Sequence, residues 1–286
     1  MFAASHIDSI LEIVLVLLAG VAAGGINAVV GSGTLVTFPA LVAFGVPPVV
    51  ATMSNAVGLV PGNVTGALGY REELRGQGKR VLQLIPASLL GALTGAYLLL
   101  HLPEDAFQSI VPVLLILALV MVITQPALQK ALKRRKDAKA AEAGPALAGD
   151  VAVAPGASGG APARMTIGTF VLVVLAVYGT AVYGGYFAAA QGIILIGFLG
   201  LLLPDPLQRL NGLKNVLVLV VNLVAGSVYV IVGWDRIDWT AVLLVAVGSL
   251  IGGYLGARVG RKFNPTLLRG IIVVLGLVAL VRILLM

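Results

Sequence analysis

The sequence contains no cysteine, which excludes disulfide bridges, thiolate metal ligands and a cysteine nucleophile. Histidine is almost as scarce, because only His6 and His101 occur and both lie at the edges of apolar segments. A membrane-embedded histidine metal site or a serine–histidine relay is therefore not expected, and neither is a bound cofactor. No GxxxxGKS/T phosphate-binding loop is present. Any transport by this chain alone is thus secondary or channel-like.

Charge is also sparse, since only 11% of the 286 residues are Asp, Glu, Lys or Arg. No carboxylate lies deep inside an apolar segment: Glu12 is near the end of one, and acids such as Asp205 lie in or beside loops. This distribution disfavours a cation pathway lined by carboxylates. The net charge of +7 comes from basic residues in short loops, where they set membrane topology. Nucleic acid is therefore not an expected partner.

Apolar residues make up 59% of the chain, a proportion typical of helical membrane proteins and not of soluble enzymes. A helix needs about 20 apolar residues to cross the hydrocarbon core. The runs of this length are residues 10–30, 48–70, 81–100, 106–124, 165–184, 207–233, 239–257 and 265–286. Two shorter runs, 34–44 and 188–203, each follow a glycine-containing break and are predicted to be half-helices. The first run is predicted to be a retained helix, because no cleavable signal precedes it.

Basic residues cluster in alternate loops, which predicts the orientation of the chain, because cytoplasmic loops collect Lys and Arg. If the ten segments alternate, all the clusters fall on one side and both termini fall on the external side. The clusters are Arg71, Arg75, Lys79 and Arg80; Lys130, Lys133, Arg134, Arg135, Lys136 and Lys139; Arg209 and Lys214; and Arg258, Arg261 and Lys262.

Two similar halves flank a linker. Residues 137–164 are rich in Ala, Pro and Gly and are predicted to be disordered and cytoplasmic. The motif SLLGALTGA at 88–96 matches SLIGGYLGA at 249–257, and both allow close helix packing. We therefore predict an all-α membrane protein with a first repeat at 1–125, a linker at 126–164 and a second repeat at 165–286. Five segments per half make the repeats inverted, as in many secondary transporters.

The first break, GGINAVVGSGTLVTFP at 24–39, places polar Asn27, Ser32 and Thr34 in an apolar context. Gly31 and Gly33 can adopt backbone conformations that residues with a Cβ atom rarely adopt. If a half-helix begins at Thr34, its free N–H groups and dipole favour an anion within the membrane. The alternative is a helix kink packed by small residues.

The second break contains Gln191, a lone glutamine among apolar residues that either donates to an oxyanion or bridges two helices. Uncharged donors follow each half-helix, and they either contact a partly dehydrated anion or bond neighbouring helices. These donors are Thr52, Ser54, Asn55, Asn211 and Asn215. Lys214 lies about 12 Å inside its segment. It either supplies charge that attracts the substrate or snorkels to the cytoplasmic surface.

Four stretches carry a resemblance to a known family: GINAVVGSGTLVTFPAL, VPPVVATMSN, YGGYFAAAQG and LNGLKN. Together they resemble the sulfite exporter TauE/SafE family of bacterial membrane transporters over nearly the whole chain outside the linker. Ser32 and Thr34 stand where many relatives have a longer glycine run. The resemblance implies movement of sulfite, organosulfonates or related small organic anions, usually outward, across the bacterial inner membrane.

We therefore expect a multi-pass carrier, not an enzyme, whose partners are a small anion and membrane lipid. Its expected substrate-binding residues are Asn27, Ser32, Thr34, Thr52, Ser54, Asn55, Gln191, Asn211, Lys214 and Asn215. Transport is expected by alternating access of the two repeats. An anion channel lined by the same donors and a non-transporting membrane assembly factor are the alternatives.

Overall fold

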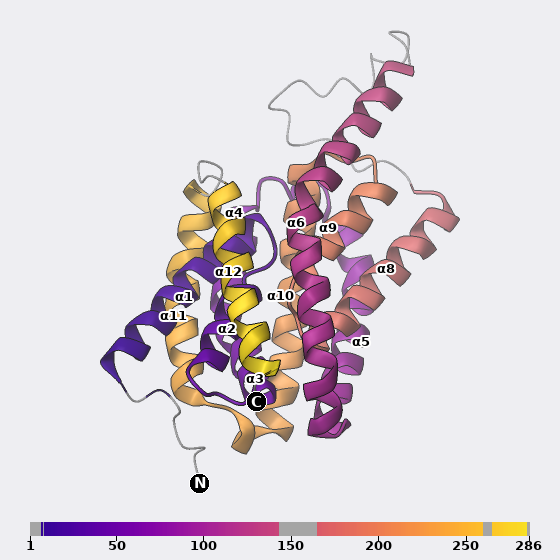
Figure 1. The fold of residues 1–286 in the computed structure, drawn as a ribbon. Helices are drawn as coiled ribbons and strands as arrows, with labels where there is room; N and C mark the ends of the chain where they lie inside the picture. The colour runs from indigo at the N-terminus through magenta and orange to yellow at the C-terminus, as the bar shows by residue number, and fades with distance from the viewer. Residues whose placement is uncertain (1–6, 8, 143–164, 260–264, 285–286) are drawn as a thin grey trace.

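The computed structural model of the protein describes residue 7 and residues 9–142, 165–259 and 265–284. All regular structure in this part of the chain is helical, as predicted (Figure 1). The helices are α1 (Ile10–Val29), α2 (Thr34–Ala43), α3 (Pro48–Gly58), α4 (Val60–Gly69), α5 (Gly78–His101), α6 (Glu104–Glu142), α8 (Ile167–Tyr186), α9 (Gln191–Leu202), α10 (Leu207–Val232), the 3₁₀ turn η1 (Trp234–Arg236), α11 (Trp239–Val259) and α12 (Pro265–Leu284).

Among the described residues, six helices are long and apolar enough to cross a membrane: α1, α5, residues 109–131 of α6, α8, α10 and residues 239–258 of α11. Helices α2 and α9, with 10 and 12 residues, are the short helices expected after the two breaks. Local chemistry explains several helix starts. A capping box between Ser9 and Glu12 begins α1, and Pro48 occupies the first turn of α3.

The structure departs from the predicted segments in two places. Residues 48–70 form two helices that meet at Leu59, because Pro61 has no N–H to continue the hydrogen-bond ladder. Helix α6 continues past the expected end at 124 and reaches Glu142. Its Ala, Lys, Arg and Gln residues favour helix, so the prediction of disorder is wrong for residues 137–142. Residues 143–164 of the predicted linker lie outside the described residues.

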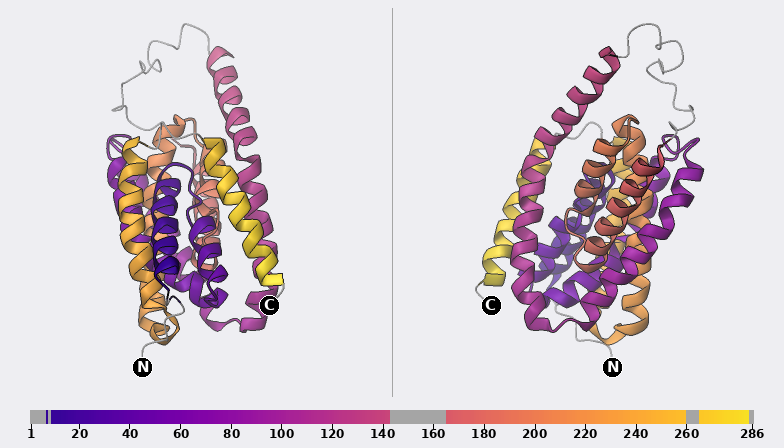
Figure 2. Two further views of the ribbon diagram at one scale, coloured as in Figure 1. Left: turned by 60° about the vertical axis from the view of Figure 1, so that its left-hand side comes forward. Right: turned by 90° about the vertical axis from the view of Figure 1, so that its right-hand side faces the viewer.

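The helices form a bundle with two distinct ends (Figures 1 and 2). Helix α1 begins and α12 ends at one end, together with the turn between α5 and α6 and with η1. The connections from α4 to α5 and from α9 to α10 lie at the other end, beyond which α6 projects. This second end carries Arg71, Arg75, Lys79 and Arg209, and we call it the basic end.

Two close helix contacts use the repeated small-residue motifs. Helix α1 packs along α11, and α5 packs along α8. A Cβ atom added to Gly24 would lie only 2.8 Å from the Cα of Ser249 in α11. A Cβ atom added to Gly185 in α8 would lie 3.1 Å from the Cα of Ala92 in α5. The prediction that both motifs permit close helix approach is confirmed. These contacts hold α1 and α8, the helices that precede the two breaks, firmly in the bundle.

Candidate functional site

The first break lies between α1 and α2, at residues 30–33. Gly31 adopts a φ of +91°, a left-handed conformation that favours glycine, and its N–H donates to the carbonyl of Ile26. Gly33 packs against the backbone of Ala23, where a side chain would overlap the Ala23 carbonyl oxygen. The two glycines thus reverse the chain, so that α2 begins inside the bundle beside the helix that precedes it.

The last carbonyls of α1 are bonded by side chains from other helices. A helix leaves its final four carbonyl groups without a partner inside the helix. Here the carbonyls of residues 27 to 30 each accept from a different side chain. The pairs are Lys214 Nζ to Asn27 at 3.2 Å, Asn215 Nδ2 to Ala28 at 3.2 Å, Asn211 Nδ2 to Val29 at 3.5 Å and Gln125 Nε2 to Val30 at 3.5 Å. Three polar residues of α10 and one of α6 therefore hold the end of α1.

Lys214 is buried, with an exposed fraction of 1%. Its ammonium group lies at the end of α1 where the helix dipole is negative, which stabilises the buried charge. The alternative of a lysine that snorkels to the surface does not fit this burial. The Lys214 amino group is instead held inside the bundle, beside the first break.

The start of α2 has the opposite polarity and carries no cap of its own. The N–H groups of Ser32, Gly33 and Thr34 donate to no carbonyl or side chain among the described residues, and Gly33 at the N-cap offers no side-chain oxygen. The Ser32 hydroxyl is buried, with 1% exposure, and likewise has no partner there. Free N–H groups at a helix N-terminus favour a negative charge. The first break therefore presents unsatisfied donors within the membrane.

Asn55 of α3 orders the first turn of α2. Its Nδ2 donates to the Thr34 hydroxyl oxygen at 3.2 Å, and its Oδ1 accepts from the Thr37 hydroxyl. The Thr34 hydroxyl then still has a proton to donate, because it acts only as an acceptor in this contact. Asn27 is held in a similar way, by a hydrogen bond from its Nδ2 to the side chain of Asn63 in α4.

The second break, at residues 187–190, lies between α8 and α9. Ala188 and Ala190 adopt φ values of 63° and 59°, which are unfavourable for residues with a Cβ atom. Strained backbone of this kind persists where the surrounding structure imposes it, and functional sites are common places for it. Gln191 opens α9 with 2% exposure, and its Oε1 has no partner in the described part of the chain. Its side chain packs directly against Gly184, where a Cβ atom would overlap it.

The two breaks meet inside the bundle. The N–H of Gly192 donates to the carbonyl of Gly31 at 3.0 Å, although 161 residues separate them in the sequence. A Cβ atom on Gly31 would lie 2.7 Å from the Gly192 Cα, and one on Gly192 would lie 2.6 Å from the Gly31 Cα. The starts of α2 and α9 therefore converge, and Ser32 and Gln191 directly follow and precede the two glycines in contact. Two positive helix ends thus share one region.

The structure brings together most of the predicted site residues but not all of them. Thr52 donates to the Pro48 carbonyl of its own helix at 2.9 Å. Ser54 accepts from the backbone N–H of Asp238 at 2.9 Å, which ties α3 to the start of α11. Neither contact involves a break. Sequence reasoning missed Gln125, whose Oε1 is buried and unpartnered among the described residues, although a lone glutamine in an apolar stretch is the same signal as Gln191.

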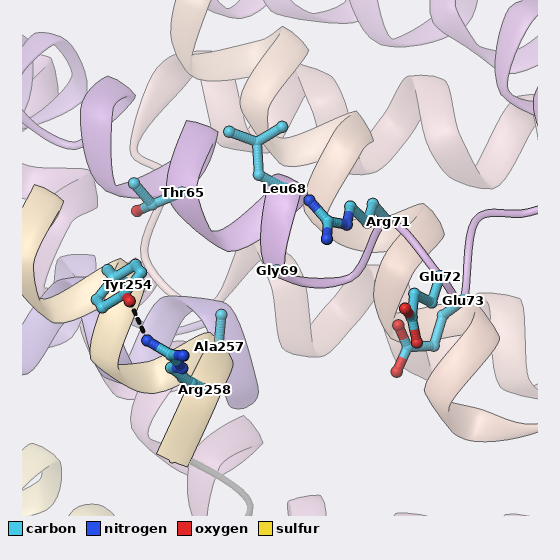
Figure 3. A pocket seen from close by; sticks show the side chains of 9 residues that line it. All are labelled: Thr65, Leu68, Gly69, Arg71, Glu72, Glu73, Tyr254, Ala257 and Arg258. Atoms are coloured by element: carbon cyan, nitrogen blue, oxygen red, sulfur yellow. Dashed lines mark hydrogen bonds between the residues drawn. The ribbon is translucent and has the colours of Figure 1, made fainter.

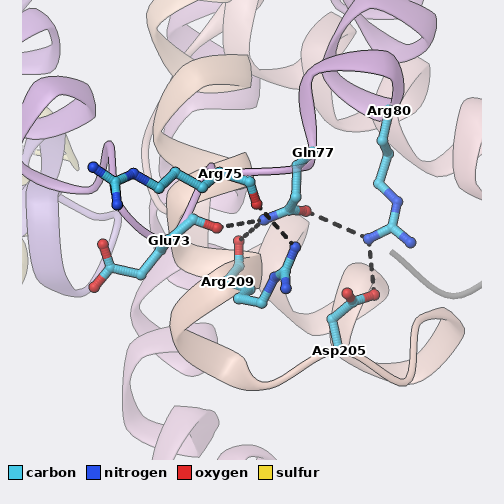
Figure 4. Close-up of polar contacts among 6 residues, drawn as sticks. All are labelled: Glu73, Arg75, Gln77, Arg80, Asp205 and Arg209. Carbon is cyan, nitrogen blue, oxygen red and sulfur yellow. Dashed lines mark hydrogen bonds and ion pairs between the residues drawn. The ribbon is translucent and has the colours of Figure 1, made fainter. Parts of the chain in front are cut away.

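A buried network closes the basic end of the bundle (Figure 4). Arg80 of α5 forms an ion pair with Asp205 at 2.8 Å, and both side chains are at most 5% exposed. Gln77 accepts from Arg80 and donates to the carbonyls of Glu73 and Arg209. This network joins the connection between α4 and α5 to the start of α10. At the converging breaks, the Ser32 and Gln191 side chains are buried in this conformation. No cluster of three or more potential metal ligands occurs among the described residues.

Comparison with known proteins gives a consistent result. The family model described as Sulfite exporter TauE/SafE matches residues 16–283. A probable membrane transporter protein, ORF9, from a Sinorhizobium species is 24% identical over 269 residues, covering 92% of this chain and 88% of that protein. The probable membrane transporter protein YfcA of Escherichia coli strain K12 is 23% identical over 257 residues, covering 90% and 83%. No solved structure matches the chain significantly.

Proposed function

Because this chain belongs to the sulfite exporter TauE/SafE family of membrane proteins, we propose that it is a secondary transporter that exports small anions such as sulfite or organosulfonates. The observation that carries the proposal is the uncapped start of α2, where three N–H groups and the buried Ser32 hydroxyl lack partners among the described residues. An oxyanion satisfies several such donors at once. Its charge also matches the positive end of the helix dipole.

We assign the ten predicted residues different tasks at this site. Ser32 and Thr34 contact the anion directly, because each hydroxyl group retains a proton to donate. Gln191 contacts it through its Nε2 amide group, which donates to no acceptor among the described residues. Asn55 positions Thr34, and Asn27 fixes α1 against α4. Lys214 supplies positive charge, while its neighbours on α10 hold the end of α1. These neighbours are Asn211 and Asn215. Thr52 and Ser54 keep α3 in place at a distance from the breaks.

Inverted repeats and alternating access complete the proposal. Reciprocal packing supports them: α1 of the first half packs on α11 of the second, and α8, the counterpart of α1, packs on α5 of the first. Such exchange of equivalent helices is what a two-fold relation between the halves produces. The site is closed in this conformation, with Ser32 and Gln191 at 1% and 2% exposure. Access from either side therefore requires a rearrangement, which favours a carrier over an open channel.

The basic end is cytoplasmic in this proposal, and the start of α1 and the end of α12 are external. The support is that the connections rich in Lys and Arg gather at one end of the bundle (Figure 1), as cytoplasmic loops do. A tag within residues 143–164 is then protected from externally added label in intact cells. A tag before residue 7 is labelled. The opposite pattern refutes this orientation and the direction of export inferred from it.

A binding screen tests the substrate site. Purified protein is titrated with sulfite, sulfate, taurine, sulfoacetate and small carboxylates, and the wild type is compared with Ser32→Ala. Loss of one hydrogen bond to a charged ligand costs about 1.5–3 kcal/mol, so affinity for the best ligand falls at least about tenfold. Ser227→Ala is the matched control, because this exposed hydroxyl only bonds the Leu223 carbonyl of its own helix. Equal affinity of all three proteins refutes the site, and no binding of any anion refutes the substrate class.

A further inference from the structure

A cavity lined partly by charged residues lies at the basic end between α4 and α11, away from the converging breaks. It has a volume of about 590 Å³ and is lined by residues from the end of α4, the loop that follows it and the last turns of α11. The lining residues are Thr65, Leu68, Gly69, Arg71, Glu72, Glu73, Tyr254, Ala257 and Arg258 (Figure 3). The Thr65 hydroxyl bonds the α4 carbonyl of Gly62 at 2.9 Å and lies 3.4 Å from the Leu250 carbonyl, so α4 and α11 touch beneath the cavity.

This cavity faces the surroundings of the bundle and not its interior. Leu68 is 61% exposed, Tyr254 is 52% exposed and Leu250 is 46% exposed, although all three are apolar or aromatic. Exposed apolar side chains on membrane-spanning helices contact acyl chains, and tyrosine is enriched where the hydrocarbon meets the headgroups. The cavity therefore lies at the depth of lipid headgroups, above an apolar surface that continues along α4 and α11.

The charges in the cavity are of both signs and are separated in space. Arg258 donates to the Tyr254 hydroxyl and lies over its ring, with 5.5 Å from the guanidinium carbon to the ring centre. The Arg71 guanidinium is exposed and forms no hydrogen bond or ion pair with the other described residues. Figure 3 shows the carboxylates of Glu72 and Glu73 together on the far side of Arg71 from Arg258. Two guanidinium groups and two carboxylates give the cavity no net charge.

We propose that this cavity binds the headgroup of an aminophospholipid such as phosphatidylethanolamine. The two arginines would bind the phosphate, because guanidinium groups match phosphate oxygens in geometry and charge. Glu72 would accept from the primary ammonium group, and the acyl chains would lie along Leu68 and Leu250. A neutral cavity with separated charges suits this zwitterion better than a purely anionic headgroup. Basic residues in cavities between membrane helices bind lipid phosphates. In this cavity Glu72 would add selectivity for the amine.

Native mass spectrometry of the intact chain in detergent tests the proposal. Phosphatidylethanolamine, phosphatidylglycerol and phosphatidylcholine with identical acyl chains are added in turn. We expect the wild type to retain the ethanolamine lipid best. Arg71→Gln and Arg258→Gln each lower that retention about fivefold, since a basic residue near a lipid surface contributes about that factor. Glu72→Gln removes the preference for ethanolamine over glycerol, because it removes the acceptor for the ammonium group and strengthens binding of the anionic glycerol lipid.

Arg75→Gln is the matched control, because this exposed arginine of the same loop lies outside the cavity. It should bind all three lipids as the wild type does, and helix content by circular dichroism confirms the fold of every variant. Equal retention of the three lipids by the wild type overturns the proposal. So does unchanged ethanolamine binding in the double arginine variant. Displacement of the lipid by millimolar phosphoethanolamine would instead identify a site for the free headgroup, which also overturns the lipid assignment.

Discussion

The contact between Gly31 and Gly192 leaves no space for a side chain at either residue, and Gly31→Ala perturbs it directly. The new Cβ atom would lie 2.7 Å from the Gly192 Cα, well inside contact distance, and no flexible side chain is available to yield. The φ of +91° adds a penalty of about 1–2 kcal/mol for a residue with a Cβ atom. Forced overpacking adds about 1–3 kcal/mol.

The two terms sum to about 2–5 kcal/mol of lost stability. In a chain of this size we expect the apparent Tm in detergent to fall by about 4 °C or more, since each kcal/mol lowers it by about 2–4 °C. Size-exclusion thermal-stability measurements on purified protein provide the assay. We also expect anion transport to fall more steeply than stability at a temperature where the variant is still folded, because the starts of α2 and α9 would separate.

Gly179→Ala is the matched control, since a Cβ atom at this position of α8 meets nothing within 4 Å. Its Tm should equal that of the wild type or rise slightly, because alanine favours helix. If Gly31→Ala were as stable and as active as Gly179→Ala, the backbone contact between the two breaks would not exist as described.

Three further changes test other parts of the structure. Lys214→Gln should lower anion affinity and flux, measured by isotope uptake, at least about tenfold, because it removes a buried charge. The control Lys79→Gln changes an exposed lysine and should lower neither. Unchanged affinity and flux in Lys214→Gln would contradict the charge assignment. Asp205→Asn should cost about 3–5 kcal/mol by leaving Arg80 buried without its ionic partner, seen as a lower Tm; a Tm within 2 °C of the wild type would refute a structural role for the pair. Gln191→Leu should weaken binding of the preferred anion about tenfold without lowering Tm. Titration calorimetry measures the affinity, and an affinity equal to that of the wild type would contradict a contact between Gln191 and the anion.

The fold was largely predictable because its strongest signals are local. Apolar runs of full length predict spanning helices, and the glycines at 31 and 33 correctly mark the place where the first run ends. The split of residues 48–70 was missed, although Pro61 provided the signal. The long extension of α6 was missed because Ala and Lys suit both a solvated helix and a disordered linker.

The candidate site was predictable in composition but not in geometry. A polar residue in an apolar run must find a partner, and this marks Asn55, Gln191 and Lys214 without showing what they bind. Only the structure shows that Lys214 and its neighbours on α10 bond the last carbonyls of α1. Likewise, no sequence pattern predicts that Gly31 and Gly192 touch, because this contact depends on how helices distant in the sequence pack together.

Flux of labelled sulfite from proteoliposomes is the most direct test of export of a small anion through the converging breaks. We expect saturable efflux from vesicles that contain the wild type, competition by an organosulfonate and a loss of at least about tenfold in Ser32→Ala, with Ser227→Ala unaffected. The absence of efflux for sulfite and for every sulfonate tested, from protein of verified fold, would contradict a role as an anion transporter. Single-channel currents recorded from the reconstituted protein would instead identify a channel.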